Sequence, residues 1–383
     1  MLILSFPVFQ EHPIAFCVWW GYAGLTLIQI LLWILLLSRA AVRKMPAIHL
    51  PEMPEPVSLI ICARNEAENL KKNLCHFLNQ NYRCFEVIVV NDASTDRTLE
   101  VLLDIQNKSR NLRIINFTNK KVGAGKKAAL AAGIHAARYD LILLSDADCK
   151  PAGDRWMAHM TAAIQGSSAA TVGLGYGPYY KLPGLLNRFI RFETVYTALQ
   201  YLSFALVGLP YMGVGRNLTY RKDLFLKTGF SNHMHLASGD DDLFVNQVAA
   251  ANRTAVVIHP EAFTFSAPKE NWRAFARQKS RHLSTATSYR PVHQVLLGFL
   301  AASHLGHYAL LMGMVCAGFS TIFDAFLLYV LRMCILLWVY AGVLKKLQEK
   351  DLLKWVPILD VLLAIYFLLS AIVPFKRMSP RWN

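Results

Sequence analysis

Charged side chains are scarce in this sequence of 383 residues. They make up 17% of the chain, whereas hydrophobic residues make up 54%, and the mean hydropathy is +0.31. This balance excludes an ordinary soluble enzyme, in which about a quarter of the residues carry charge. Part of the chain must therefore be apolar enough to enter a bilayer.

Acidic residues are the scarcer charged class. The chain has 25 Asp and Glu against 40 Lys and Arg, for a net charge of +15. Such an excess fits nucleic acid, or else anionic lipid headgroups and nucleotide diphosphates. The membrane spans described below favour the second interpretation, and we expect no nucleic-acid partner.

The sequence also lacks a disulfide or zinc framework. Its seven cysteines have no paired metal-ligand spacing, and several lie in apolar segments, where Cys serves as a small core residue. This usage is typical of a reducing compartment. The sequence contains no internal repeat and no low-complexity tract.

The first long apolar run covers residues 14–37 and is almost uncharged. Arg39, Arg43 and Lys44 follow it directly, so the positive-inside rule places the N-terminus outside and the chain from residue 45 onward in the cytoplasm. A cleaved signal peptide is the alternative, but its basic residues would precede the apolar run. We expect residues 1–44 to form an uncleaved transmembrane anchor.

A second apolar region occupies residues 291–383. Its candidate spans are residues 293–319, 321–343 and 352–375. Asp324 and Arg332 interrupt the second span, and we expect them to face protein or water rather than lipid. With a cytoplasmic central domain, three crossings would leave the C-terminus outside, whereas Lys376, Arg377 and Arg381 favour the inside. Either one of the three C-terminal stretches is re-entrant or interfacial, or residues 14–37 do not cross the membrane. The sequence leaves these alternatives open.

Between the apolar regions, the pattern predicts an α/β domain. Residues 45–56 hold four prolines and form a stiff linker. Strands are predicted at 57–63, 85–90, 112–117 and 139–144, and helices at 66–78, 96–105 and 126–137. This alternation indicates βαβ units around a parallel sheet. Residues 182–210 are aromatic and apolar with scattered charges, which favours helices lying on the membrane or on the sheet.

A pair of carboxylates stands where the last of these strands ends. Asp146 and Asp148 follow the apolar run 141–144, and ligands of open α/β sheets bind at the carboxyl ends of the strands. Carboxylates at this spacing can share one divalent cation, whose remaining positions suit a diphosphate. The alternative for this short motif alone is a solvated turn.

Four motifs in order resemble the nucleotide-sugar half of the family 2 glycosyltransferases. They are Val57-Ser58-Leu59-Ile60-Ile61-Cys62-Ala63-Arg64-Asn65-Glu66, Val89-Val90-Asn91-Asp92-Ala93-Ser94-Thr95-Asp96, Gly125-Lys126-Lys127-Ala128-Ala129-Leu130 and Asp146-Ala147-Asp148. The resemblance covers roughly residues 55–285. It implies the GT-A fold, a Rossmann-like mixed sheet, with residues 57–180 as the nucleotide-sugar half and 181–290 as the acceptor half.

The resemblance also implies roles for the residues that follow the strands. A departing diphosphate builds negative charge, which Mg²⁺ or Mn²⁺ would stabilise on Asp146 and Asp148, with Asp148 the more direct ligand. Asp92 would accept a hydrogen bond from the nucleotide base, and Lys126 would lie near the phosphates. Arg64 and Glu66 would sit beside the uridine or ribose. Residues 91–96 can also cap a helix, and both roles can coexist.

A second acidic cluster follows near residue 240. The family pattern makes Asp240 and Asp241 an acidic pair, with Asp241 as the general base that deprotonates the acceptor hydroxyl. Asp240 is the first alternative, and Asp242 could replace either because three consecutive carboxylates leave the register ambiguous. Repulsion among the three should raise at least one pKa. The non-catalytic alternative is that the cluster caps a helix at 243–251, a role that needs only one Asp.

Two further motifs complete the expected site. Gln278 and Arg281 match the family's Gln-x-x-Arg-Trp motif, and Arg281 would contact the diphosphate. His282 replaces the Trp, which puts polymer synthesis in doubt. By resemblance, the stretch containing Gly213, Gly215, Arg216 and Asn217 would line the donor sugar and acceptor, together with His282. Asn217 also begins a glycosylation sequon, which a cytoplasmic location would leave unused.

These observations predict an inverting, metal-dependent glycosyltransferase. It would move a sugar from a nucleotide-sugar, UDP-linked, to a lipid acceptor at the cytoplasmic face of a bacterial inner membrane. A processive synthase of the cellulose, chitin or hyaluronan type is the alternative enzyme. A degenerate sugar-binding membrane scaffold is the alternative from outside the enzymes. The sequence leaves the donor sugar and the oligomeric state open.

Overall fold

A computed structural model describes residues 13–44, 52–118, 125–165, 169–230, 234, 236, 238–317 and 322–372. These divide into two compact units, one made of residues 13–43 and 291–372 and the other of residues 44–290. Pro46 and Pro51 of the predicted linker lie outside the described residues. So do Lys376, Arg377 and Arg381, on which the conflict over membrane topology rests.

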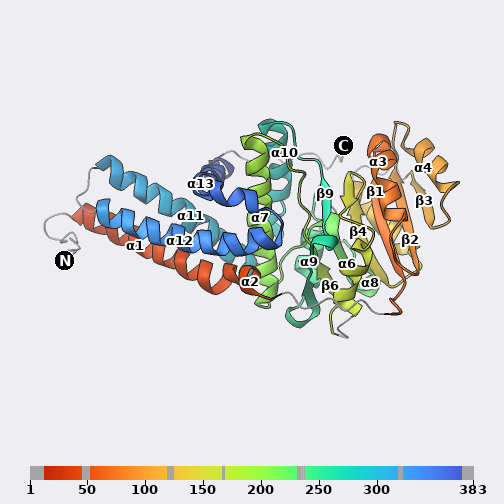
Figure 1. Cartoon of the computed structure of the whole chain (residues 1–383), viewed down its shortest axis with the longest axis horizontal. Coiled ribbons are helices and arrows are strands. Elements are labelled where there is room, and N and C mark those ends of the chain that lie inside the picture. The colour runs from red at the N-terminus through yellow and green to blue at the C-terminus, as the bar shows by residue number, and fades with distance from the viewer. Residues whose placement is uncertain are drawn as a thin grey trace. The chain divides into compact units, whose positions relative to one another are not determined.

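The second unit is built on a seven-stranded mixed sheet with the order β3-β2-β1-β4-β7-β6-β8 (Figure 1). Its strands are β1 (Val57–Ala63), β2 (Phe85–Asp92), β3 (Leu112–Phe117), β4 (Leu141–Asp146), β6 (Val172–Leu174), β7 (Leu218–Arg221) and β8 (Thr254–Val256). Strands β1 to β4 run parallel, and β7 is antiparallel to both β4 and β6. The four strands predicted from the alternation form the parallel part of the sheet, and the sheet as a whole is mixed, as the GT-A resemblance implies.

Helices cover both faces of this sheet, which explains why most residues of its central strands are apolar. On one face pack α3 (Ala67–Leu78), α4 (Thr98–Gln106) and α6 (Trp156–Gln165), whose buried side chains meet alternate residues of β1 and β2. On the other face lies α5 (Gly125–Ala136). A Cβ on its Gly133 would come within 2.7 Å of Ile60, so only glycine permits this close approach.

Short elements complete the unit around the ends of the strands. They are β5 (Cys149–Pro151), β9 (Thr264–Ser266), α7 (Leu185–Leu206), η2 (Gly215–Asn217), α8 (Lys222–Thr228), α9 (Asp242–Val248), η4 (Ala251–Arg253), η5 (Pro260–Ala262), α10 (Trp272–Leu283) and η6 (Ala286–Ser288). Strands β5 and β9 pair antiparallel as a separate two-stranded sheet. The stretch 182–210 contains one helix, α7, and most of its side chains are buried within the unit.

Two predicted helix boundaries differ for identifiable reasons. Asp96 precedes α4 rather than starting it, because its carboxylate accepts hydrogen bonds from the N–H groups of Thr98 and Ala67 and so caps two helix starts. Helix α9 ends at Val248, three residues before the predicted end, since the chain then turns through η4 into β8.

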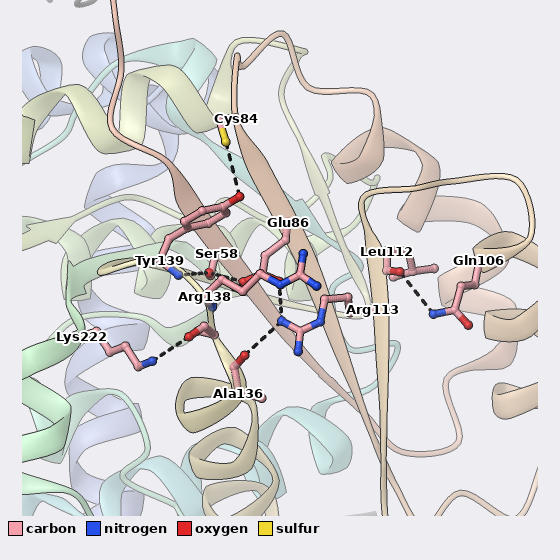
Figure 2. A network of polar contacts seen from close by, with 11 residues as sticks. Ser58, Cys84, Glu86, Gln106, Leu112, Arg113, Ala136, Arg138, Tyr139 and Lys222 are labelled. Atoms are coloured by element: carbon pink, nitrogen blue, oxygen red, sulfur yellow. Dashed lines mark hydrogen bonds and ion pairs between the residues drawn. The ribbon is translucent and has the colours of Figure 1, made fainter.

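A buried polar network ties the sheet together away from the carboxyl ends of its strands (Figure 2). The carboxylate of Glu86 accepts hydrogen bonds from Ser58 at 2.7 Å and from Arg113 at 2.6 Å. Arg113 also donates to the carbonyl of Ala136, the last residue of α5, at 3.0 Å. The network therefore joins β1, β2 and β3 to the C-terminal end of α5.

Among the described residues of the first unit, four helical segments are long and apolar enough to cross a membrane: Pro13–Val42, Pro291–Cys316, Ile322–Lys346 and Lys350–Ile372. They comprise α1 (Pro13–Leu32), η1 (Trp33–Leu37), α2 (Ser38–Val42), α11 (Pro291–Ala317), α12 (Ile322–Lys346), η7 (Lys350–Trp355) and α13 (Val356–Ile372). Arg332 lies buried among them and pairs with Asp360 at 2.9 Å. It faces protein, as the sequence predicts.

Candidate active site

A cleft of about 320 Å³ opens at the carboxyl end of the parallel strands. Cys62 near the end of β1 and Asp146 at the end of β4 line one wall. Met212, residues 214–216, the acidic cluster at 240–241 and side chains of α7 and α10 are also part of the lining. The cleft thus gathers segments that are more than 200 residues apart in the sequence.

The predicted metal-binding carboxylates lie together in this cleft. Ligand atoms of Asp146, Asp148 and Cys149 lie within 4.8 Å of one another. Burial, and then the neighbouring charge of Asp146, raises the pKa of Asp148, while Arg216 partly offsets both effects. A divalent cation would relieve this repulsion, and carboxylate oxygens suit Mg²⁺ or Mn²⁺. Cys149 is fully buried in β5, so the two carboxylates are the fitting ligands.

The described residues contain one other group with metal-binding side chains: His159, His259 and Glu261. Glu261 already pairs with the guanidinium of Arg155 at 2.5 Å and with His159 Nε2 at 2.8 Å. The positive charge of Arg155 opposes a divalent cation at that carboxylate. The carboxylate pair in the cleft is therefore the better cation site.

Lys126 connects the two acidic clusters. Its Nζ lies 2.9 Å from Asp146 Oδ1 and 2.9 Å from Asp240 Oδ2. Burial opposes the charge of Lys126, but the two carboxylates outweigh it and hold the lysine pKa well above its usual value. The same contact overcomes the effect of burial on Asp240 and lowers that pKa. A lysine at the start of α5 is disfavoured by the helix dipole, and these two anions compensate for it.

The three consecutive carboxylates occupy different environments. Asp240 and Asp241 line the cleft, whereas Asp242 lies outside its lining. Asp242 instead accepts hydrogen bonds from Tyr289 at 2.8 Å and from Thr285. The geometry therefore leaves two of the three predicted candidates for the base within reach of a bound substrate.

Asp241 has no cationic partner at ion-pair distance in the part of the chain that the structure describes. Its Oδ2 accepts the backbone N–H of Gly215 at 2.6 Å, and its Oδ1 accepts that of Asp242 at 2.8 Å. Burial, followed by the charges of Asp240 and Asp242, raises its pKa to about 7. A carboxylate with that proton affinity is well matched to general base catalysis near neutral pH.

The predicted nucleotide-binding residues lie at the ends of two neighbouring strands. Arg64 follows β1 and lies 3.6 Å from Asp92, the last residue of β2. Burial raises the pKa of Asp92, and Arg64 partly offsets this. Glu66 lines the cleft itself, where burial and then Asp148 and Asp146 raise its pKa. Of these three residues, Glu66 lies in the cleft lining with Asp146 and Asp148, whereas Arg64 and Asp92 lie outside the lining.

Helix α10 brings the third predicted motif to the cleft. Gln278, Arg281 and His282 all line it, and Gln278 donates to the hydroxyl of Tyr179 at 3.2 Å. An Asn271 side chain caps the helix start by accepting from the N–H of Ala274. The motif is thus held on a capped helix facing the carboxylates.

The predicted acceptor stretch separates into cleft and core residues. Gly215 and Arg216 line the cleft, but Gly213 and Asn217 do not. Asn217 is fully buried and hydrogen-bonds to Trp156 and to the carbonyls of Tyr176 and Ala262. In this fold it stabilises the core, and its sequon is inaccessible. The sequence pattern could not separate these neighbours, because they lie in a loop and a short 3₁₀ turn, where no regular periodicity assigns a residue to one face.

Several lining residues were not expected from the sequence: Tyr176, Tyr179, Thr194, Thr197, Tyr201, Met212, Lys269 and Lys279. Thr194, Thr197 and Tyr201 share one face of α7 at helical spacing. Their helical spacing can be read from the sequence, but the sequence does not show that this face of the helix lines a cleft. Lys269 and Arg281 have no ion-pair partner among the described residues, so they can meet an anionic ligand.

Part of this chain is similar in sequence to known glycosyltransferases. The family model Glycosyl transferase family 2 matches residues 58–226. The uncharacterized glycosyltransferase YaiP of Escherichia coli K12 is 30% identical over 236 residues, covering 58% of this chain and 55% of YaiP. The poly-beta-1,6-N-acetyl-D-glucosamine synthase of Staphylococcus aureus COL is 31% identical over 110 residues. That match covers 29% of this chain and 26% of the synthase. This chain therefore spans only about half, or less, of the length of these relatives.

A solved structure shares the fold. The mannosyltransferase PcManGT from Pyrobaculum calidifontis, in complex with GDP-Man and Mn²⁺, superposes with a TM-score of 0.58 at 18% identity. The match covers 93% of this chain and 99% of that one. At this identity the likeness is one of fold, which is the GT-A architecture predicted from the four motifs.

Proposed function

Residues 58–226 carry a family 2 glycosyltransferase domain of the GT-A fold, and on that basis we propose that the protein is an inverting glycosyltransferase. It takes a sugar from a nucleotide-sugar, UDP-linked, and transfers it to a membrane lipid. The observation that carries the proposal is the placement of Asp241, with its pKa near 7, in the same cleft as Asp146 and Asp148. A base and a diphosphate site in one cleft are what the reaction requires.

Asp241 is the general base in this proposal. It removes the proton of an acceptor hydroxyl while that oxygen forms a bond to the anomeric carbon of the sugar. The bond from that carbon to the diphosphate breaks at the same time, and the nucleoside diphosphate leaves. Attack on the face opposite the leaving group inverts the configuration. Asp240 is less suited to this role, because Lys126 lowers its pKa.

Cationic side chains receive the leaving group. Arg281 and Lys269 line the cleft and can donate to phosphate oxygens, as can Lys126 once a ligand is bound. Asp146 and Asp148 would hold Mg²⁺ or Mn²⁺, which supplies Lewis-acid stabilisation of the diphosphate when bound. Arg64, Asp92 and Glu66 would bind the nucleoside. Residues 57–180 thus form the donor half, and residues 181–290 the acceptor half.

A lipid acceptor is supported by the membrane character of the rest of the chain. The four apolar helical segments would hold the transferase domain at the bilayer, on the cytoplasmic side according to the charges after residue 38. His282 occupies the motif position where polymer synthases usually carry Trp. A processive polysaccharide synthase remains the second candidate, favoured by the similarity to the staphylococcal synthase.

The test uses the full-length protein purified and reconstituted in lipid. Labelled nucleotide-sugars would be offered with a total bacterial lipid extract and either Mn²⁺ or Mg²⁺. We expect label in a small organic-soluble product and release of the nucleoside diphosphate. Asp148→Ala, Asp241→Asn and chelation with EDTA should each abolish transfer, and added metal should reverse the chelation. Asp154→Asn, an exposed change away from the cleft, is the control.

Other outcomes discriminate the alternatives. Label in a long aqueous or insoluble polymer would favour the synthase. Donor binding without turnover by a folded protein, under all of these conditions, would favour the non-catalytic scaffold.

A further inference from the structure

The third carboxylate of the acidic cluster is held by the chain segment that follows α10. Asp242 Oδ2 accepts hydrogen bonds from Tyr289 Oη at 2.8 Å and from Thr285 Oγ1, and its Oδ1 accepts the N–H of Leu243 at 2.7 Å. All three side chains that make these contacts are buried: Asp242 is 7% exposed, Thr285 0% and Tyr289 8%. Asp242 is therefore fixed in place by two hydroxyl groups.

The same segment forms hydrogen bonds with α9 at a second point. The backbone N–H of Arg290 donates to Asn246 Oδ1 at 2.9 Å, and the Arg290 guanidinium donates to the carbonyl of Gln247 at 2.8 Å. Residues 285–290 thus contact α9 both at its first residue and one turn later. They also form the direct continuation of the helix that carries Gln278 and Arg281.

We propose that Thr285 and Tyr289 are positioning residues for the base Asp241. This inference rests on the proposed transferase function. Asp241 Oδ1 accepts the backbone N–H of Asp242, so a shift of Asp242 moves both the carboxylate and its hydrogen-bond donor. Anchoring Asp242 through its side chain therefore fixes the orientation of Asp241 toward the acceptor.

The arrangement also distributes charge among the three neighbours. The positive charge of Lys126 compensates the negative charge of Asp240, and two hydroxyl groups donate hydrogen bonds to Asp242. Asp241 accepts hydrogen bonds from backbone N–H groups only. The charged groups acting on Asp241 include Asp240, Asp242, Lys126 and Lys127. Burial raises the pKa of Asp242, and the hydroxyl donors of Thr285 and Tyr289 partly offset this by stabilising the anion. The negative charge of Asp242 in turn raises the proton affinity of Asp241.

The test compares Thr285→Val, Tyr289→Phe and the double variant in the full-length protein. Loss of either hydroxyl should lower kcat roughly tenfold, part of the contribution of a positioned base, and leave the donor KM within about twofold. It should also move the acidic limb of the kcat profile to lower pH by about half a unit, because Asp242 then binds a proton more readily. Effects in the double variant should be less than additive, since both hydroxyls act on one carboxylate.

Matched controls separate this role from general stability. Tyr139→Phe and Thr254→Val remove hydroxyls far from the cleft lining and should leave kcat and the pH profile unchanged. Asp242→Asn keeps an acceptor for both hydroxyls but removes the charge. It should also shift the acidic limb to lower pH, and it serves if Tyr289→Phe fails to fold.

The inference is overturned if the hydroxyl variants, or Asp242→Asn, keep the wild-type kcat and acidic limb while Asp241→Asn is inactive. Turnover by Asp241→Asn would instead refute the assignment of Asp241 as the base, and a folded wild-type protein that transfers no sugar would refute the proposed function itself.

Discussion

The backbone N–H of Gly215 donates to the carboxylate of Asp241 across 2.6 Å, and no side chain separates them. A Cβ on Gly215 would lie 3.1 Å from Asp241 Oδ2 and 3.2 Å from its Cβ. Those contacts are closer than ordinary van der Waals separation, so a larger residue would push the carboxylate away from its donor. Glycine at this position is required by the position of the base rather than by the backbone torsion angles of the turn.

Gly215→Ala should therefore impair catalysis more than folding. We expect kcat to fall by at least tenfold, because displacement of a general base by a few tenths of an ångström weakens proton transfer. The midpoint of thermal unfolding should change little. Gly153→Ala is the matched control, since a Cβ there meets nothing within 4 Å. Normal turnover by Gly215→Ala would show that Asp241 needs no such close support.

The pH dependence of transfer follows from the environment of Asp241. A base must be deprotonated to act, so activity should rise with pH through a midpoint at about 7, the raised pKa of this carboxyl group. Asp240 contributes to that rise in pKa through its negative charge. Asp240→Asn should then move the acidic limb of kcat/KM to lower pH while transfer persists. Complete loss of transfer in Asp240→Asn, at every pH, would identify Asp240 as the base instead.

Glu86 links the strands to α5 and should matter for stability alone (Figure 2). Glu86→Gln leaves the Arg113 guanidinium, whose side chain is 32% exposed, beside a neutral partner, which should cost about 2 kcal/mol of unfolding free energy. Thermal unfolding in detergent measures this, with the exposed Glu68→Gln as control. Transfer by the folded fraction should be unchanged, because the network lies away from the cleft.

The same carboxylate predicts how stability varies with pH. Burial alone would raise the pKa of Glu86, but Arg113, the N–H of Arg138 and Ser58 outweigh it and lower the pKa. A carboxyl group with a depressed folded-state pKa stabilises the fold above its unfolded-state pKa of about 4.3. That contribution is lost as pH falls through the folded-state value. Wild type and Glu86→Gln should therefore converge in stability under acid conditions and differ most at neutral pH.

Sequence periodicity was sufficient to locate the strands of the donor half of the fold, but it did not locate those of the acceptor half. Strands β1, β2 and β4 are buried on both faces, so their apolar runs end sharply at Asp92 and Asp146 and reveal where ligands bind. Strands β6 and β8 have three residues each and carry no comparable pattern. Their place in the sheet is set by pairing with partners distant in sequence, which no local signal encodes.

In the candidate site, too, some features could be predicted from the sequence and others could not. Asp146, Asp148 and the acidic cluster could be recognised because carboxylates at strand ends and in runs are unusual. The ion pairs from Lys126 to both clusters could not, since they join residues 20 and 114 positions apart through the fold. Nor could the sequence tell which of Asp240, Asp241 and Asp242 faces the cleft, because a helix start turns neighbouring side chains in different directions.

Arg332 and Asp360 should hold the first unit together. The two side chains are fully buried, and Arg332 also donates to Gln29 while Tyr308 donates to Asp360, so four helices, α1, α11, α12 and α13, meet at one charge pair. Asp360→Asn would leave the guanidinium uncompensated, at a cost of about 3–5 kcal/mol. Asp351→Asn, at an exposed position of η7, is the control.

Thermal unfolding and membrane yield of the full-length protein measure this prediction. Asp360→Asn should lower both markedly, and the double variant Arg332→Gln with Asp360→Asn should recover part of the loss, because a neutral pair leaves no buried charge. Equal stability of Asp360→Asn and wild type would mean that water or lipid headgroups solvate Arg332. Failure of the double variant to recover would mean that shape and hydrogen bonding, rather than charge compensation, hold these helices together.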